Sequence, residues 1–168
     1  MTRFALLAAA LFASAAPLSA QETLATSAGS VTITPIVADL DEPWAFGFLP
    51  EGGVLITERG GTLVHVSREG ARQTVSGLPQ IAVGGQGGLL AIMLPRDFAQ
   101  TREVVLSYAR PQGRGSGTAV AVGRLSADGT RLEAPRPTLD MEPRPRGGRP
   151  LGPRIAGAPP RFPSATIR

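Results

Sequence analysis

Short β-type segments separated by glycine-containing turns constrain the fold of this chain more than any other feature. The candidate strands are residues 31–37, 44–49, 54–58, 62–67, 71–75, 89–94, 103–109 and 118–125. Strands of this length, with glycine turns at this spacing, indicate an antiparallel meander. The part after the first 20 residues contains no segment with the period of a long helix. The sequence therefore predicts an all-β fold, and repeated four-stranded meanders are typical of β-propeller blades.

The N-terminal segment, residues 1–20, has the composition of a secretory signal peptide. Arg3 supplies a positive start, residues 4–16 are apolar and uncharged, and residues 18–20 form a small-residue cleavage site. We expect the mature protein to be exported, to the periplasm or outside the cell. A retained membrane anchor is the alternative. Residues 21–30 are small and polar, and we expect a linker there.

Composition excludes several kinds of site. The chain has no cysteine, so it can form neither disulfides nor thiolate metal sites. His65 is the single histidine, which excludes a cluster of several histidines within the chain. All 17 basic residues are arginine, and eight of them fall in residues 131–168. The positive charge thus belongs largely to the C-terminal part, and the export signal disfavours a nucleic-acid function.

A glycine cluster at residues 84–88 surrounds one polar side chain, Gln86, and leads directly into an apolar strand. Glycine permits positive φ angles and close approach of another group. A tight turn entering a strand is the simplest interpretation. A glutamine presented at the end of a sheet could also donate and accept hydrogen bonds without adding charge.

Four segments in a fixed order carry a family resemblance. They are LDEPWAF at 40–46, LITERGGTL at 55–63, GQGGLL at 85–90, and Asp97-Phe98 followed by the strand that ends at Tyr108. Together they resemble the N-terminal blades of the soluble pyrroloquinoline quinone (PQQ)-dependent sugar dehydrogenases. This is the group of glucose/sorbosone and aldose sugar dehydrogenases. The resemblance covers residues 31–133, which are expected to form a partial β-propeller.

The resemblance implies the first blades of an incomplete six-bladed β-propeller. It also implies an enzyme family that uses PQQ and calcium to oxidise an aldose at C1 to the lactone. Gln86 would lie at the rim of that site and hydrogen-bond the sugar. The alternative is that Gln86 only ties down its own loop. The PQQ and calcium ligands of the family belong to later blades, so we do not expect this chain to bind either cofactor.

Three other residues or pairs invite a functional assignment. His65 lies within a candidate strand, where a cross-strand partner is a better interpretation than a catalytic base. Glu58 precedes a glycine turn and is expected to be a turn or surface group without a role. Asp97-Phe98 resembles the end of a family signature, but Pro95-Arg96 stands where histidine-proline is usual. A structural corner is therefore expected there.

The C-terminal segment, residues 134–168, holds nine of the 16 prolines. Each proline removes a backbone donor, so an irregular or disordered tail is expected. The resemblance places the family's general-base histidine at Pro150, while Arg154 matches the arginine of the same motif. We therefore expect a truncated or frameshifted sugar dehydrogenase that is inactive by itself. The alternative is a non-catalytic exported β-domain that binds a glycan or a protein partner.

Overall fold

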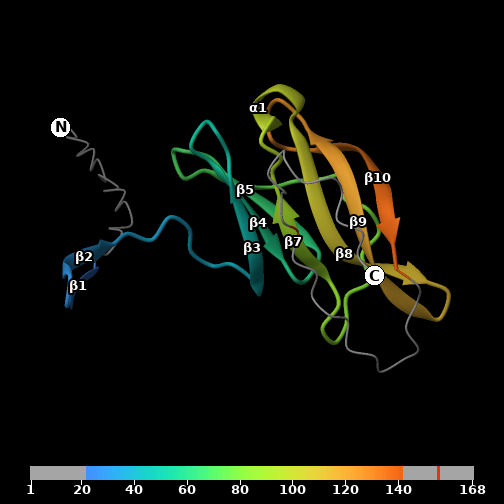
Figure 1. Ribbon diagram of the computed structural model, residues 1–168, viewed down its shortest axis with the longest axis horizontal. Helices are drawn as coiled ribbons and strands as arrows, with labels where there is room; N and C mark the ends of the chain where they lie inside the picture. Colours follow the sequence, from blue (N-terminus) through green and yellow to red (C-terminus); the bar gives the residue numbers. More distant parts are fainter. Residues whose placement is uncertain (1–21, 142–154, 156–168) are drawn as a thin grey trace, which may run out of the picture. The chain divides into compact units, whose positions relative to one another are not determined.

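The computed structural model describes residues 22–141 and residue 155, and β-strands make up nearly all of the regular structure there (Figure 1). In these residues the one helix is the single turn α1 (Phe98–Thr101). The chain divides into two units, residues 1–36 and 37–168, and each is described by itself. No helix in the described part has the length and apolar character needed to cross a membrane. The predicted all-β class is confirmed.

The first unit contains a β-hairpin where a linker was expected at 21–30. Strands β1 (Glu22–Thr26) and β2 (Gly29–Ile33) pair antiparallel along their whole length. In the turn, the hydroxyl of Thr26 donates a hydrogen bond to the carbonyl of Gly29 at 2.7 Å. Every residue of both strands is exposed. The strand expected at 31–37 is present over residues 31–33 only, as the end of β2. Residues 22–26 and 29–30, expected as a linker, are strands as well, because strands without a buried face lack the apolar alternation on which strand prediction depends.

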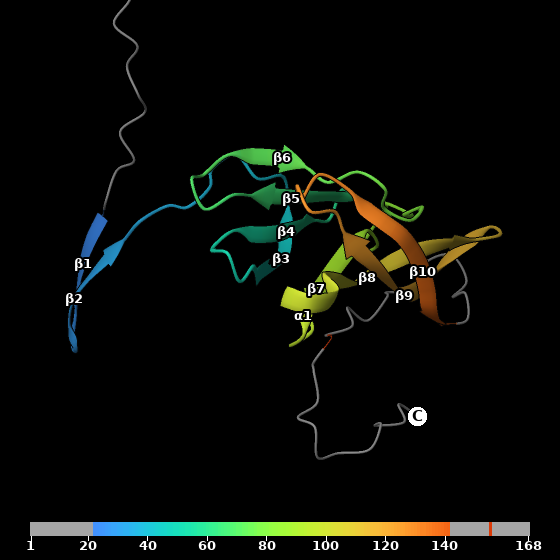
Figure 2. The same cartoon turned by 90° about the horizontal axis from the view of Figure 1, so that it is seen from above.

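The first sheet of the second unit is a four-stranded antiparallel meander. Its strands, in spatial order, are β3 (Pro43–Phe48), β4 (Val54–Glu58), β5 (Thr62–Val66) and β6 (Arg72–Thr74). Figure 2 shows these strands in the same order across the sheet. All four were predicted from the sequence at nearly these bounds, because a turn with glycine or proline ends each of them.

The second sheet is also a four-stranded antiparallel meander. Its strands are β7 (Leu89–Met93), β8 (Glu103–Gln112), β9 (Gly115–Leu125) and β10 (Leu132–Asp140). β7 is an edge strand of this sheet, and it lies against β3 and β4 of the first sheet (Figure 1). The two meanders are therefore packed against each other within one unit.

Strand β10 corrects the expectation of an irregular segment from residue 134. Residues 134–140 belong to the strand although Pro135 and Pro137 lie within it. Proline is compatible with this position because β10 is an edge strand with β9 as its one neighbour, and because its register with β9 shifts twice. The rest of the predicted tail, apart from residues 141 and 155, lies outside the described residues.

The main core lies between the two sheets. The first sheet and the loops next to it contribute Leu49, Leu55, Leu63 and Val75, and the second contributes Leu89, Ile92, Val104, Leu106, Tyr108, Ala119, Ala121, Leu125 and Leu132, with Phe98 from α1. Leu55, Leu63 and Leu106 have no exposed surface. Burial of a leucine side chain stabilises a fold by about 1.5–3 kcal/mol relative to exposure, so these contacts are the main force between the sheets.

A buried hydroxyl joins the two sheets at their centre. The Oγ1 atom of Thr57, on β4, lies 2.6 Å from the carbonyl oxygen of Leu90 on β7 and donates a hydrogen bond to it. The backbone N–H of Ala45 donates to the same hydroxyl at 3.1 Å. Thr57 has no exposed surface. One side chain thus connects strands β3, β4 and β7.

The other face of the first sheet is apolar and partly open. Trp44, Phe46 and Phe48 alternate along β3 and are 48%, 62% and 65% exposed. The rings of Phe46 and Phe48 meet edge to face, with centroids 5.3 Å apart. Phe46 pairs with Ile56 in the sheet, so the row continues into the buried cluster of Val54, Ile56, Val64 and Val66.

Candidate functional site

The glycine loop, residues 84–88, begins as a tight two-residue turn around Gly85 and Gln86. The N–H of Gly87 donates to the carbonyl of Gly84 at 2.8 Å, and the N–H of Gly84 donates in return at 3.4 Å. Gly85 stands at the first central position with a φ of 55°. That position of a type II′ hairpin turn favours glycine, which explains the residue there.

Gly88 allows the loop to dock against the end of β4. A Cβ atom at this position would overlap the carbonyl oxygen of Arg59. The backbone continues this contact, because the N–H of Leu89 donates to the Arg59 carbonyl at 3.2 Å. On its other side, the Gly88 carbonyl accepts a hydrogen bond from Ala109 at 2.8 Å. The loop is therefore fixed between the two sheets through backbone groups that only a glycine lets approach.

Gln86 is exposed at the tip of this turn. Within the described part of the chain, its side-chain amide has no hydrogen-bond partner. Other groups hold the loop, and the amide carbonyl and NH₂ group are both available to a ligand. A neutral amide in this position can donate and accept hydrogen bonds with a polyol.

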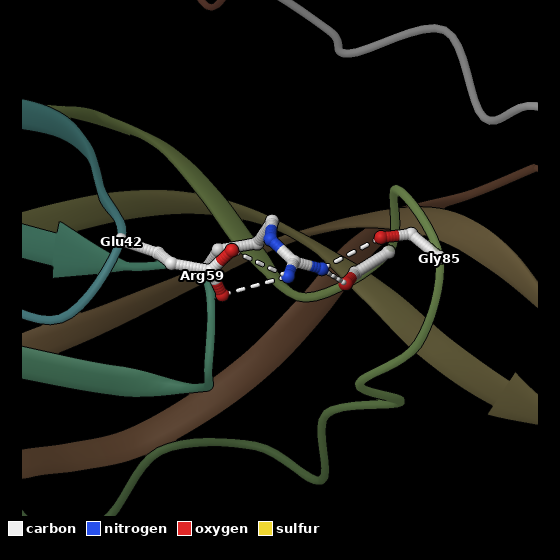
Figure 3. Close-up of polar contacts among 4 residues, drawn as sticks. Glu42, Arg59 and Gly85 are labelled. Carbon is white, nitrogen blue, oxygen red and sulfur yellow. Dashed lines mark hydrogen bonds and ion pairs between the residues drawn. The ribbon is translucent and has the colours of Figure 1, made fainter.

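The side chain of Arg59 hydrogen-bonds to the backbone of the loop (Figure 3). Its Nη1 atom donates to the carbonyl of Gly85 at 2.6 Å and approaches the carbonyl of Gly87 at 3.5 Å. Its Nη2 atom donates to both carboxylate oxygens of Glu42, at 2.8 Å and 2.6 Å. The Arg59 side chain is 22% exposed and that of Glu42 is 55% exposed. Neither residue was assigned a role from the sequence.

His65 has the structural role that the sequence predicted. It lies on β5 opposite Gln73 of β6, and its Nδ1 atom is 2.8 Å from the side-chain nitrogen of Gln73. Gln73 also donates to the carbonyl of Asp128 at 3.1 Å, in the turn between β9 and β10. This cross-strand pair connects the two sheets, which confirms the interpretation of His65 as a partner within the sheet.

The expectation that Glu58 is a turn or surface group was wrong. Glu58 is 4% exposed and accepts a hydrogen bond from the N–H of Asp41 at 2.9 Å. It also pairs with the guanidinium of Arg72, two strands away on β6, at 3.2 Å. Arg72 in turn donates to the carbonyl of Asp39 at 2.7 Å. The contact joins segments separated in sequence, so no local pattern could reveal it.

Asp97-Phe98 forms the structural corner that was expected. Phe98 is 3% exposed and belongs to the core, and the guanidinium of Arg102 lies 5.6 Å from the centre of its ring. Arg102 ends the helix in the left-handed conformation, with a φ of 55°. The proposed base position at Pro150 and the neighbouring Arg154 lie outside the described residues.

Comparison with known proteins identifies the class. A family model described as glucose/sorbosone dehydrogenase matches residues 40–161. The match covers more than half of the chain, so the chain belongs to the glucose/sorbosone dehydrogenase family. The resemblance stated from the sequence motifs is confirmed.

Individual relatives extend this result. The aldose sugar dehydrogenase YliI of Escherichia coli (strain K12) is 40% identical over 129 residues, which make up 75% of this chain and 35% of the relative. An uncharacterised protein of Synechocystis is 31% identical over 157 residues, covering 87% of this chain and 37% of that protein. The chain therefore spans about a third of the length of the curated relatives it matches.

Solved structures share the fold. A crystal structure of a glucose dehydrogenase superposes with a TM-score of 0.60 at 44% identity, over 62% of this chain and 31% of that one. The soluble aldose sugar dehydrogenase of Escherichia coli, in its apo form, gives 0.59 at 43% identity over 62% of this chain and 31% of that one. The PQQ-bound aldose sugar dehydrogenase of Streptomyces coelicolor gives 0.57 over 76% of this chain and 36% of that one. At 22% identity, it shows the shared fold alone.

Proposed function

We propose that the two four-stranded sheets are the first two blades of a six-bladed β-propeller of the aldose-oxidising type. The family reaction would oxidise an aldose at C1 to the lactone, with the hydride passing to PQQ. The family membership and the packing of two consecutive meanders support this proposal. The exposed row of Trp44, Phe46 and Phe48 supports it further, because an apolar sheet face of this kind suits a neighbouring sheet.

Within this activity, Gln86 is the sugar-contacting residue. The observation that carries the assignment is the exposed amide of Gln86, held at the tip of a docked turn with no partner in the described structure. A neutral donor and acceptor suits the hydroxyl groups of a neutral sugar. The chain is exported under this proposal, and an N-terminus at Gln21 in protein recovered from the periplasm or medium is the expected result.

The described residues do not fit the cofactors themselves. They contain no group of three or more His, Asp or Glu side chains that could hold a metal ion. The guanidinium of Arg59 is engaged by Glu42 and by loop carbonyls, so it is not available to a polyanionic quinone. With proline at the position of the general base, Pro150, the chain is proposed to be inactive by itself, because proline cannot accept the hydroxyl proton.

The test uses the full chain in two assays. Dye reduction with an aldose, PQQ and Ca²⁺ is expected to show no turnover, and turnover would refute the proposed inactivity. Titration with glucose, followed by NMR through the backbone amides of residues 84–88 in every variant, is expected to give a saturable shift in the wild type. The Gln86→Ala variant should lose glucose binding, while the Gln100→Ala variant, which changes an exposed glutamine on α1, should retain it.

The titration also separates the two function classes. No response to any aldose, in a chain that is folded, would refute the sugar contact of Gln86. Binding of a polysaccharide or a protein in its place would favour the non-catalytic exported β-domain.

A further inference from the structure

Arg59 connects three segments that are distant in the sequence (Figure 3). It follows the last residue of β4, its Nη2 atom binds Glu42 before β3, and its Nη1 atom reaches the glycine loop. Its backbone contributes as well, since its N–H donates to the Glu42 carbonyl at 3.0 Å and its carbonyl accepts from Leu89. Arg59 therefore contacts the Glu42 segment on one side, and the glycine loop with the start of β7 on the other, through both its side chain and its backbone.

The bonds of Arg59 act on the peptide groups that surround Gln86. The Gly85 carbonyl belongs to the peptide that enters Gln86, and Arg59 holds it at 2.6 Å. The next peptide is held within the turn, because the N–H of Gly87 donates to Gly84. The Gly87 carbonyl, in the following peptide, lies 3.5 Å from the same guanidinium. The backbone around Gln86 is thus fixed while its side chain has no partner in the described structure.

The loop needs such an external contact because four of its five residues are glycine. Glycine loses more conformational freedom on ordering than any other residue. Hydrogen bonds from a charged donor are stronger than neutral ones, and the Arg59 side chain is largely shielded from water. These bonds oppose the tendency of the loop to adopt other conformations.

Glu42 holds the guanidinium in place. Both of its carboxylate oxygens accept from Nη2, which directs Nη1 toward the loop. Glu42 itself has a φ of 48°, a left-handed conformation that residues other than glycine seldom adopt. Such a conformation persists only where surrounding contacts hold it. The pair is close to neutral, so a loop that faces a neutral sugar gains rigidity without net charge.

We propose that Arg59 is a positioning residue that fixes the glycine loop and so presents the amide of Gln86 to the sugar, with Glu42 orienting Arg59. This inference rests on the proposed sugar contact of Gln86. Lysine cannot replace Arg59, because it lacks the planar fork that binds a carboxylate and a carbonyl at once.

Amide hydrogen exchange of the full chain tests the positioning step without any ligand. The amide of Gly87 is expected to exchange about tenfold faster in Arg59→Gln, since a hydrogen bond from a charged group is lost. Arg59→Lys should not restore protection, and Glu42→Gln should show an intermediate increase. The matched control is Arg136→Gln. This variant breaks an exposed ion pair with Glu103 at the start of β8, whereas Gly88 of the loop bonds to Ala109 near the end of that strand. Wild-type exchange of Gly87 in Arg59→Gln would overturn the proposal.

Glucose titration at a temperature where all variants are folded tests the second step. The Kd for glucose is expected to rise about tenfold in Arg59→Gln and Arg59→Lys and to stay unchanged in Arg136→Gln. A general loss of stability would not change Kd under these conditions. Equal Kd values for wild type and Arg59→Gln would overturn the inference. If the wild type does not bind glucose, the proposed function fails, and Gly87 exchange still decides whether Arg59 holds the loop.

Discussion

Thr57 allows a sharp test of what holds the two sheets together. Replacement by valine preserves the shape of the side chain and removes the hydroxyl. The Leu90 carbonyl then loses a donor at 2.6 Å, and the Ala45 N–H loses an acceptor at 3.1 Å. Each buried group left without its partner costs about 1–3 kcal/mol, so two groups would cost about 2–6 kcal/mol. Because Ala45 is half-buried, Thr57→Val should reduce the free energy of unfolding by about 2–4 kcal/mol.

Thr57→Ser is the matched variant, because it retains the hydroxyl and removes one buried methyl group. Its expected cost is about 1 kcal/mol. Urea unfolding followed by circular dichroism and tryptophan fluorescence measures both values. The hydrogen-bond argument predicts that valine is the more damaging substitution, whereas an argument from buried apolar volume predicts the reverse order. A serine variant less stable than the valine variant would refute the reasoning.

Three further substitutions test separate features of the fold. Hydrogen bonds from Ser126 and from Thr130 lower the pKa of Asp128 from 3.8 to about 2. Its contribution to the free energy of unfolding is therefore fully present above pH 3.8 and is lost as the pH falls through about 2. Asp128→Asn should remove that part of the acid dependence, measured as urea midpoints between pH 5 and pH 2; an unchanged profile would contradict the assignment. Gly88→Ala should destabilise the chain by about 2 kcal/mol through its clash with the Arg59 carbonyl. Gly60→Ala, where a Cβ has room, should change stability by less than about 0.5 kcal/mol, and equal effects would rule out the clash. Glu58→Gln should cost about 1 kcal/mol, since Arg72 is partly solvated, and a double-mutant cycle with Arg72→Gln that shows no coupling would exclude the ion pair.

The strands of the second unit could be predicted because their signals are local. Alternating or continuous apolar residues mark each strand, and glycine turns mark its ends, as between β4 and β5. Two expectations failed, for different reasons. Strand β1 and the start of β2 have no buried face, and β10 carries prolines that only an edge position permits.

The candidate site, like the fold, could be predicted from the sequence only in part. The motif around Gln86 and the role of His65 followed from the residues and their neighbours. Glu58, Glu42 and Arg59 were missed as partners because each contact joins segments that are distant in the chain. A charged residue beside a glycine turn has the same local appearance whether it is solvated or buried.

The amino-acid sequence by itself determined the all-β class, the approximate bounds of strands β3 to β9 and the membership in a sugar dehydrogenase family. These depend on the period of apolar residues, on turn glycines and on short motifs, which are all local along the chain. Only the tertiary structure decided that Thr57 joins the sheets, that Glu58 is buried, and that Arg59 hydrogen-bonds to the glycine loop next to Gln86. The physical reason is that burial and hydrogen-bond partners are properties of neighbours in space, and sheet packing creates those neighbours from distant segments.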